Sequence, residues 1–378
     1  MTTPRSDVTE DTASAVSEDT TPARRGGLPR GARLLRTVPP TAWLLVLIGL
    51  ACVDATLLDR SSLYVFVFNT ALLACIGAVA LNVLMGTTGQ VSVGNAAFLA
   101  VGAFSSVIAN RAGFGFVAEL GFAMLVGAVV GFVVGLPASR IRGLYFALAT
   151  LAAQFIVLFL AQQYQQRVSR DGFIMPVFYQ DLGYLPGLRA WTWTLFGVVV
   201  LVCLLCAALM YGKSGRALRL IRDHEGAAPA MGIPVSRYRL SIFVVTSMLI
   251  AVQGSLTAHM IGSVTTDQFT FALAVSYIVM ILIGGLDSIP GALFGAFFVT
   301  FLPQYLPAAV AGMTGLDGIR ENGPQLALIV YGVLVMIFIT SAPRGVAGWA
   351  RHVPALLSRV SGTGRSHDGD DQRGVGRR

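Results

Sequence analysis

Residues 191–211 read WTWTLFGVVVLVCLLCAALMY, and residues 212–239 read GKSGRALRLIRDHEGAAPAMGIPVSRYR. An apolar run of the first kind, about 20 residues long, forms a helix that crosses about 30 Å of hydrocarbon. The second stretch is too polar to remain in lipid, and another apolar run begins at residue 240. The two stretches predict a pair of membrane helices joined by a long basic loop, 212–239.

The whole chain has the composition of a membrane protein. Hydrophobic residues make up 55% of its 378 residues, charged residues make up 12%, and the mean hydropathy is +0.71. A helix satisfies its own backbone hydrogen bonds, which lipid cannot do. We therefore expect an all-α fold, a polytopic transmembrane helix bundle. The net charge of +8 does not indicate nucleic-acid binding, because the basic residues fall in loops and tails.

Ten apolar segments are candidate spans: 41–58, 63–86, 89–109, 117–138, 143–164, 191–211, 240–262, 268–286, 289–308 and 324–341. An even number of spans puts both termini on one side. Besides the basic loop, the connections and tail on that side hold Arg140, Arg142, Arg344, Arg351 and Arg359. Cytoplasmic loops carry an excess of Lys and Arg, so both termini and the basic loop are expected in the cytoplasm.

The termini differ in composition from the apolar part of the chain. Residues 1–40 are polar and are expected to form a disordered cytoplasmic N-terminal extension without a cleavable signal peptide. Residues 41–342 form the expected transmembrane domain, which includes the basic loop. Residues 343–378 form the expected cytoplasmic C-terminal tail.

The residue inventory argues against an enzyme. Gly212-Lys213-Ser214 is similar to the end of a phosphate-binding loop, but Ala207 stands where that motif needs its first glycine. The chain therefore has no expected nucleotide site, and ATP-driven work would need a partner. Cys203 and Cys206 form a CxxC within an apolar run, where small apolar helix residues are the favoured interpretation. We expect no cofactor and no metal site.

Two glycine-rich segments interrupt apolar runs, LNVLMGTTGQVSVGNAAFLAVGAF at 81–104 and VMILIGGLDSIPGALFGAFF at 279–298. Interrupted helices in corresponding positions of two halves are a sign of a transport path. Small residues that merely allow close helix packing are the alternative. The expected path residues are Gly89, Gln90, Ser92, Gly94, Asn95, Gly284 and Gly285.

Polar residues within the apolar runs are few. Those expected to face the bundle interior either hydrogen-bond across helices or face water: Asn82, Gln90, Ser92, Asn95, Gln154 and Gln253. Asp54 and Asp287 are identified as the only acidic residues in or beside apolar segments, and both are expected to be solvated near helix ends. His259 is expected to be an interfacial side chain. The absence of a buried charge relay argues against proton-coupled transport.

Four motifs resemble those of branched-chain amino-acid ABC importer permeases. They are the run at 81–104, GLYFALATLA at 143–152, GRALRLIRDHEGAAPAMGI at 215–233 and IGGLDSIPGALFGA at 283–296. The resemblance covers nearly all of 41–342 and is greatest to the longer of the two paired permeases. It implies a location in a bacterial inner membrane. It also implies as partners a sister permease, two cytoplasmic ATPases and an extracytoplasmic solute-binding protein, besides membrane lipid.

The resemblance also assigns a role to the basic loop. The family pattern Glu-x-Ala-Ala…Gly forms a coupling helix that sits in a groove of the ATPase. The residues expected to couple this chain to an ATPase are Arg216, Arg219, Glu225, Ala227, Ala228 and Gly232. An ordinary basic loop near anionic lipid is the alternative.

The chain departs from the family pattern at Asn95, where His is common, and at Asp287, where Gly is usual. Both residues flank the glycine-rich segments, so the solute stays open between branched-chain or related amino acids and urea or short-chain amides. A stand-alone ion-coupled transporter and a non-transporting membrane scaffold are the other hypotheses.

Overall fold

The computed structural model describes residues 40–57, 62–141, 143–169 and 188–314, with short pieces between 329 and 340. Within these ranges all regular elements are helices and strands are absent, which confirms the all-helical expectation for this part of the chain. The expected N-terminal extension up to residue 39 and the tail at 343–378 lie outside the described residues. So does much of the tenth candidate span.

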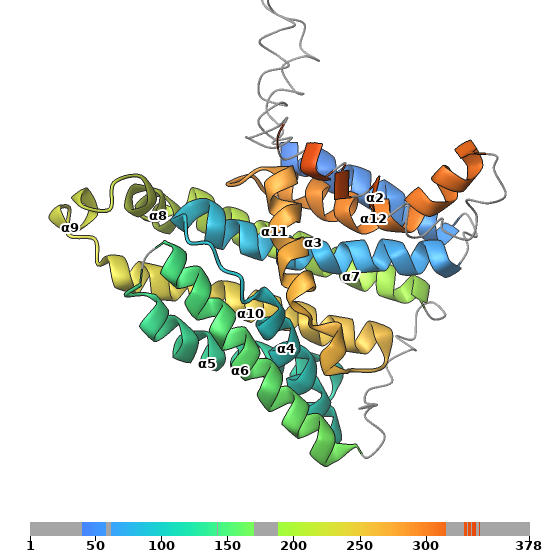
Figure 1. Ribbon diagram of the computed structural model, residues 1–378, viewed down its shortest axis with the longest axis horizontal. Helices are drawn as coiled ribbons and strands as arrows, with labels where there is room; N and C mark the ends of the chain where they lie inside the picture. Colours follow the sequence, from blue (N-terminus) through green and yellow to red (C-terminus); the bar gives the residue numbers. More distant parts are fainter. Residues whose placement is uncertain are drawn as a thin grey trace, which may run out of the picture. The chain divides into compact units, whose positions relative to one another are not determined.

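Figure 1 shows the helices in chain order. They are α2 (Pro40–Leu57), α3 (Ser62–Thr88), α4 (Asn95–Arg111), α5 (Phe116–Ala138), α6 (Leu144–Val168), α7 (Leu188–Tyr211), α8 (Lys213–Asp223), α9 (Ala227–Ala230), α10 (Val235–Ile261), the 3₁₀ helix η1 (Thr266–Gln268), α11 (Phe271–Gly284) and α12 (Ile289–Thr314). Each of the first nine candidate spans overlaps one of these helices.

The lengths of the apolar helices bear on the expected number of spans. In the described ranges, six apolar helical segments have the necessary length: Ser62–Thr88, Phe116–Pro137, Leu144–Val168, Arg189–Tyr211, Val235–Ile261 and Thr266–Gly284. The segment Leu44–Asp54 of α2 and the segment Ile289–Tyr305 of α12 are also apolar. α4 has 17 residues, which is fewer than the roughly 20 that a full crossing needs. The described residues therefore contain six of the ten expected spans at full-crossing length, and the number of spans in the whole chain stays a prediction.

α3 is the central helix. It packs against α7, α10, α11 and α12, and nearly all its residues from Val65 to Thr88 are buried. A helix that is apolar on every face belongs inside a bundle. Within this core, the Thr192 hydroxyl of α7 donates to Asn69 Oδ1 of α3 at 2.8 Å. Cys203 and Cys206 are buried in α7 as free thiols.

Glycines bring α5 and α10 together. Gly127, Gly131 and Gly135 stand four residues apart on α5, so they form one stripe along the helix. A Cβ placed on each would lie within 3.0 Å of a side chain of α10, namely those of Ala251, Ser247, Leu240 and Phe243. Small residues at this spacing let two membrane helices approach closely. The stripe therefore fixes which face of α5 packs on α10.

α4 and α10 also cross at glycines. A Cβ placed on Gly102 would lie 1.9 Å from the Ala251 carbonyl oxygen, and one on Gly254 would lie 2.0 Å from the Leu99 carbonyl oxygen. The two backbones are therefore in direct contact. Close by, the Ser106 hydroxyl of α4 donates to the Ser255 hydroxyl of α10.

Candidate coupling surface and polar path

α8 is an amphipathic helix at one end of the bundle, beside α9 and the start of α10 (Figure 1). Gly215, Leu218 and Ile221 are spaced three residues apart and are buried, whereas Lys213 and Arg216 are exposed. This spacing puts the buried residues on one face of the helix. α8 packs with that face against α3, α7 and α10, so it is part of the bundle surface rather than a loose connector.

Arg219 points from α8 toward the turn between α11 and α12. Its Nε and Nη2 atoms donate to the two carboxylate oxygens of Asp287, each at 3.0 Å, and its Nη1 donates to the Met210 carbonyl at 3.1 Å. The hydrogen bonds to Asp287 raise the pKa of Arg219 above its ordinary value. A two-point pair of this kind fixes both the distance and the orientation of the partners.

Asp287 has an unusual backbone conformation. Its φ is 62°, in the left-handed region that favours glycine. Its N–H donates to Asn82 Oδ1 at 2.9 Å, and Asn82 Nδ2 donates to the carbonyls of Ser288 at 2.8 Å and Gly285 at 3.3 Å. The expectation of a solvated Asp287 is wrong, because the side chain is 28% exposed and paired. A glycine would fit this backbone without strain, but it would not bind Arg219.

Arg222 lies about one turn beyond Arg219 and contacts a different part of the bundle. Its Nη1 donates to the Gly86 carbonyl near the end of α3. A Cβ on Gly89 would lie 3.2 Å from Arg222 Cγ. We call the non-helical residues 89–94 the first break and residues 285–288 the second break. α8 thus contacts the second break through Arg219 and the start of the first break through Arg222.

The short helix α9 forms the tip of the basic loop. It ends in a glycine turn in which the Gly232 N–H donates to the Pro229 carbonyl at 2.9 Å and the Ile233 N–H donates to the Ala228 carbonyl at 3.1 Å. This pair of bonds is the Schellman motif, and Gly232 has the positive φ of 77° that it requires. Ala228 is buried, whereas the tip exposes Ala227, Pro229, Ala230 and Met231.

The other two expected coupling residues with charged side chains interact within the chain. Glu225 lies 2.8 Å from Arg239 of α10, whose side chain is 9% exposed. Arg216 is exposed and donates to the Tyr211 carbonyl at 3.4 Å. Glu225 is therefore paired within the chain, whereas the Arg216 side chain stays on the surface of the basic loop.

Buried amides without protein partners among the described residues lie in the first break (Gln90), at the start of α4 (Asn95) and in α6 (Gln154). The Val93 N–H donates to the Thr150 hydroxyl of α6 at 3.1 Å, and a Cβ on Gly94 would lie 2.6 Å from the Thr150 carbonyl oxygen. Gln90, Asn95 and Gln154 are at most 8% exposed. Among the described residues, neither amide atom of any of the three has a hydrogen-bond partner. Buried amides normally bind protein, water or ligand.

The remaining expected path residues are placed by packing. Ser92 is buried in the first break. Gly284 packs against α12, since a Cβ there would lie 2.0 Å from the Gly291 carbonyl oxygen, and Gly285 has a φ of 105°. Asn82 binds the second break, and Gln253 Nε2 donates to the Tyr277 hydroxyl. Close packing and cross-helix hydrogen bonding therefore account for the residues around the second break.

A buried pair of ionisable residues was missing from the expectations. Glu119 lies inside α5 and His259 inside α10, and the side chain of each is 0% exposed. His259 Nε2 lies 3.0 Å from Glu119 Oε2, and Asn110 Nδ2 of α4 donates to Glu119 Oε1 at 3.0 Å. The assignment of Asp54 and Asp287 as the acidic residues of the apolar segments is therefore wrong. His259 lies in the last turn of α10, as expected, but its side chain is fully buried and stacks with the ring of Trp191 at 6.3 Å.

Residues 63–339 match the model of the family described as the branched-chain amino acid transport system permease component. The chain belongs to this family. This confirms the family expected from the four motifs. The protein is a multi-pass membrane permease component of an ABC importer, and it is not itself the catalyst of ATP hydrolysis. Membership implies ATPase and binding-protein partners.

Among its relatives is the high-affinity branched-chain amino acid permease protein LivM of Salmonella typhimurium. It is 26% identical over 342 residues, which cover 83% of this chain and 76% of the relative. The fructose import permease protein FrcC of Rhizobium meliloti is 28% identical over 304 residues, covering 76% of this chain and 78% of the relative. A metal-chelate type ABC transporter in an inward-facing conformation aligns with 16% identity and a TM-score of 0.44, over 78% of this chain and 97% of that chain.

Proposed function

We propose that this permease translocates branched-chain or related amino acids across a bacterial inner membrane, driven by two cytoplasmic ATPases. A sister permease completes the pathway, and an extracytoplasmic binding protein delivers the solute. Both termini and the basic loop lie in the cytoplasm in this proposal. The LivM relatives support the solute class, and the arginine bias of the loops supports the orientation.

The observation that carries the mechanism is that one helix contacts both breaks. α8 binds Asp287 through Arg219 and the Gly86 carbonyl through Arg222. Rigid elements transmit displacement through such discrete contacts. Movement of an ATPase against the tip at Ala227–Met231 would shift α8, and α8 would move both breaks together. The proposed coupling residues therefore act in two sets, an outward tip and an inward pair of arginines.

The first break is the proposed path for the solute. The buried amides of Gln90, Asn95 and Gln154 offer donors and acceptors without a net charge. An amino acid zwitterion has no net charge and carries both an ammonium donor and a carboxylate acceptor. Unbound amide groups at this depth are unfavourable by about 1–3 kcal/mol each, so water or solute is expected to bind them.

Substitution of Met231 by Glu tests the docking surface. Met231 is 70% exposed at the tip, and a carboxylate there would lose water when an apolar contact closes over it. The matched control is Phe114→Glu, since Phe114 is 47% exposed in the connection between α4 and α5. We expect Met231→Glu alone to reduce co-purification of the ATPases and solute uptake. Unchanged ATPase binding in that variant would disprove the docking role.

Uptake assays in proteoliposomes test the energy source and the solute. Labelled leucine, fructose and urea are supplied with the cognate binding protein, because the fructose relative makes a sugar the second candidate. We expect leucine uptake that stops when the ATPases carry a hydrolysis-blocking substitution. Uptake that persists with such ATPases and follows an ion gradient would instead identify a secondary transporter.

A further inference from the structure

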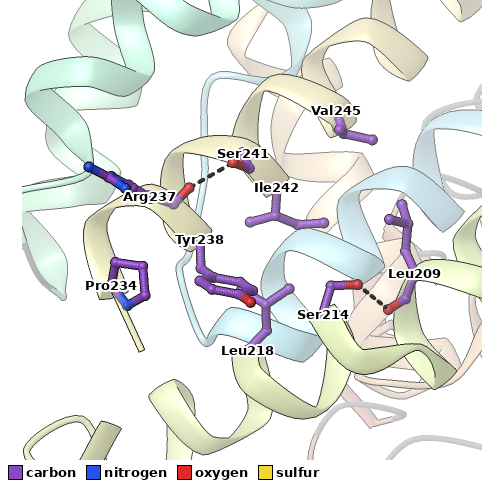
Figure 2. Close-up of a pocket in the computed structure, with 9 residues that line it drawn as sticks. All are labelled: Leu209, Ser214, Leu218, Pro234, Arg237, Tyr238, Ser241, Ile242 and Val245. Carbon is purple, nitrogen blue, oxygen red and sulfur yellow. Dashed lines mark hydrogen bonds between the residues drawn. The ribbon is translucent and has the colours of Figure 1, made fainter. Parts of the chain in front are cut away.

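A groove opens at the boundary between the membrane spans and the basic loop (Figure 2). It has a volume of about 280 Å³ and is lined by Leu209, Ser214, Leu218, Pro234, Arg237, Tyr238, Ser241, Ile242 and Val245. These residues come from the end of α7, from α8, from the connection after α9 and from the start of α10. None of them belongs to the proposed solute path or to the α9 tip.

The floor of the groove is apolar. Leu209, Leu218, Ile242 and Val245 contribute aliphatic side chains, and Figure 2 shows the ring of Tyr238 between Pro234 and Leu218. The two serine hydroxyls donate to backbone carbonyls, Ser241 to that of Arg237 at 2.8 Å and Ser214 to that of Leu209 at 3.3 Å. The floor therefore offers a hydrocarbon surface with little unused hydrogen-bonding capacity.

The rim of the groove is basic. Arg237 is exposed, and its side chain extends away from the floor in Figure 2. Among the described residues, no carboxylate forms an ion pair with it. Lys213 and Arg216 are exposed on the neighbouring α8, and no acidic residue lines the groove. An anionic group just beyond the apolar floor would therefore meet only positive charge.

Two tyrosines indicate the depth of the groove. Tyr211 is 67% exposed at the end of α7, and Tyr238 lies one turn into α10. Tyrosine is enriched where hydrocarbon meets water, and both helices begin or end their apolar spans here. The groove thus lies at the level where acyl chains give way to phosphate groups.

We propose that this groove binds an anionic phospholipid, with an acyl chain along the apolar floor and its phosphate near Arg237. Basic pockets between membrane helices are known to hold anionic head groups. The apolar floor excludes a free phosphate ion as the occupant, since such an ion would gain nothing from it. The proposal does not depend on ATPase docking or on the identity of the solute.

Photoreactive lipids test the proposal on the complete importer complex. The complex is reconstituted in phosphatidylcholine vesicles that contain some phosphatidylglycerol, with a diazirine-tailed form of one of the two lipids. Labelled peptides are identified by mass spectrometry. We expect the phosphatidylglycerol probe to label peptides that contain residues 209–218 and 234–245 more than the phosphatidylcholine probe does.

Substitutions in the groove test which side chains bind the lipid. Arg237→Gln should reduce the preference for phosphatidylglycerol about five-fold, the value for one basic residue near an anionic surface. Ser241→Phe should remove the labelling, because Ser241 is an exposed lining residue and the ring would fill the groove. Arg140→Gln, an exposed arginine after α5, is the matched control.

Two results would overturn the proposal. Equal labelling by both lipids, unchanged in Ser241→Phe, would mean that the groove meets only the general lipid annulus. Labelling that appears only after the ATPases are removed would mean that a protein covers the groove in the complex. Thermal unfolding of each variant confirms that a loss of labelling does not come from misfolding.

Discussion

Replacement of Asp287 by Ala and by Gly separates two opposing effects at the second break. Asp287 binds Arg219 through two hydrogen bonds, and the two side chains are 28% and 31% exposed. The contribution of such a pair to stability lies between that of a surface ion pair, about 0–1 kcal/mol, and that of a charged hydrogen bond in a buried site, about 1.5–3 kcal/mol. We take about 1.5 kcal/mol for its contribution to the free energy of unfolding.

The backbone at position 287 acts in the opposite direction. A non-glycine residue in the left-handed region is unfavourable by about 1–2 kcal/mol, and Asp287 has a φ of 62°. Ala keeps this strain and loses the ion pair, so Asp287→Ala should destabilise the protein by the contribution of the pair, about 1.5 kcal/mol. Gly loses the pair but relieves the strain, so Asp287→Gly should destabilise it by only about 0.5 kcal/mol.

Unfolding in mixed micelles with increasing SDS measures both variants, together with Arg219→Gln and the double variant Arg219→Gln/Asp287→Ala. The double-mutant cycle should give a coupling energy of about 1.5 kcal/mol. Equal destabilisation by Ala and Gly would refute the strain argument. A coupling energy below about 0.3 kcal/mol would refute the ion-pair argument, because independent sites add within about that limit.

Three further predictions concern a crossing of two helices, a buried pair of side chains and the glycine turn at the tip of the basic loop. Gly102→Ala should destabilise the protein by about 1–3 kcal/mol in the same SDS titration, because its Cβ would overlap the Ala251 carbonyl, whereas Gly197→Ala, with open space around it, should have little effect. Glu119→Ala should destabilise the protein by about 3 kcal/mol, because His259 and Asn110 lose a buried partner. Glu119→Gln should destabilise it by clearly less, and equal effects of the two substitutions would contradict the pairing. Gly232→Ala should weaken ATPase binding about five-fold, because Ala at this positive φ adds about 1 kcal/mol of strain at the tip. Gly226 has a φ of −71°, so Gly226→Ala should leave the binding unchanged. Titration of the ATPase subunit measures both variants.

The helices could be predicted from the sequence because each apolar run carries its own signal. The segment 191–211 lies within α7, and the helical tendency around Arg216–Gly232 appears as α8 and α9. The number of helices that cross the membrane completely was harder to predict from the sequence. α4 was assigned a span from its apolar composition, but it begins only at Asn95, after the first break.

The contacts of charged residues could not be predicted from their neighbours in the sequence. Arg219 and Asp287 are 68 positions apart, so no pattern within the basic loop links them. Glu119 stands alone in FVAELGFAM, and only the packing of α5 against α10 brings it to His259. The glycine stripe Gly127, Gly131 and Gly135 was readable as a small-residue motif, but the sequence does not identify α10 as its partner.

The internal contacts of the basic loop have a consequence for purification of the complex. Arg219, Arg222 and Arg239 interact with groups of this chain, and the outermost turn exposes the apolar side chains of Ala227, Pro229 and Met231. Salt screens attractions between exposed charges but does not weaken apolar contacts. In the proposed function, an assembly held through this turn would remain intact at ionic strengths that separate proteins joined by complementary charges. A high-salt wash would then remove contaminants without removing the proposed ATPase partners.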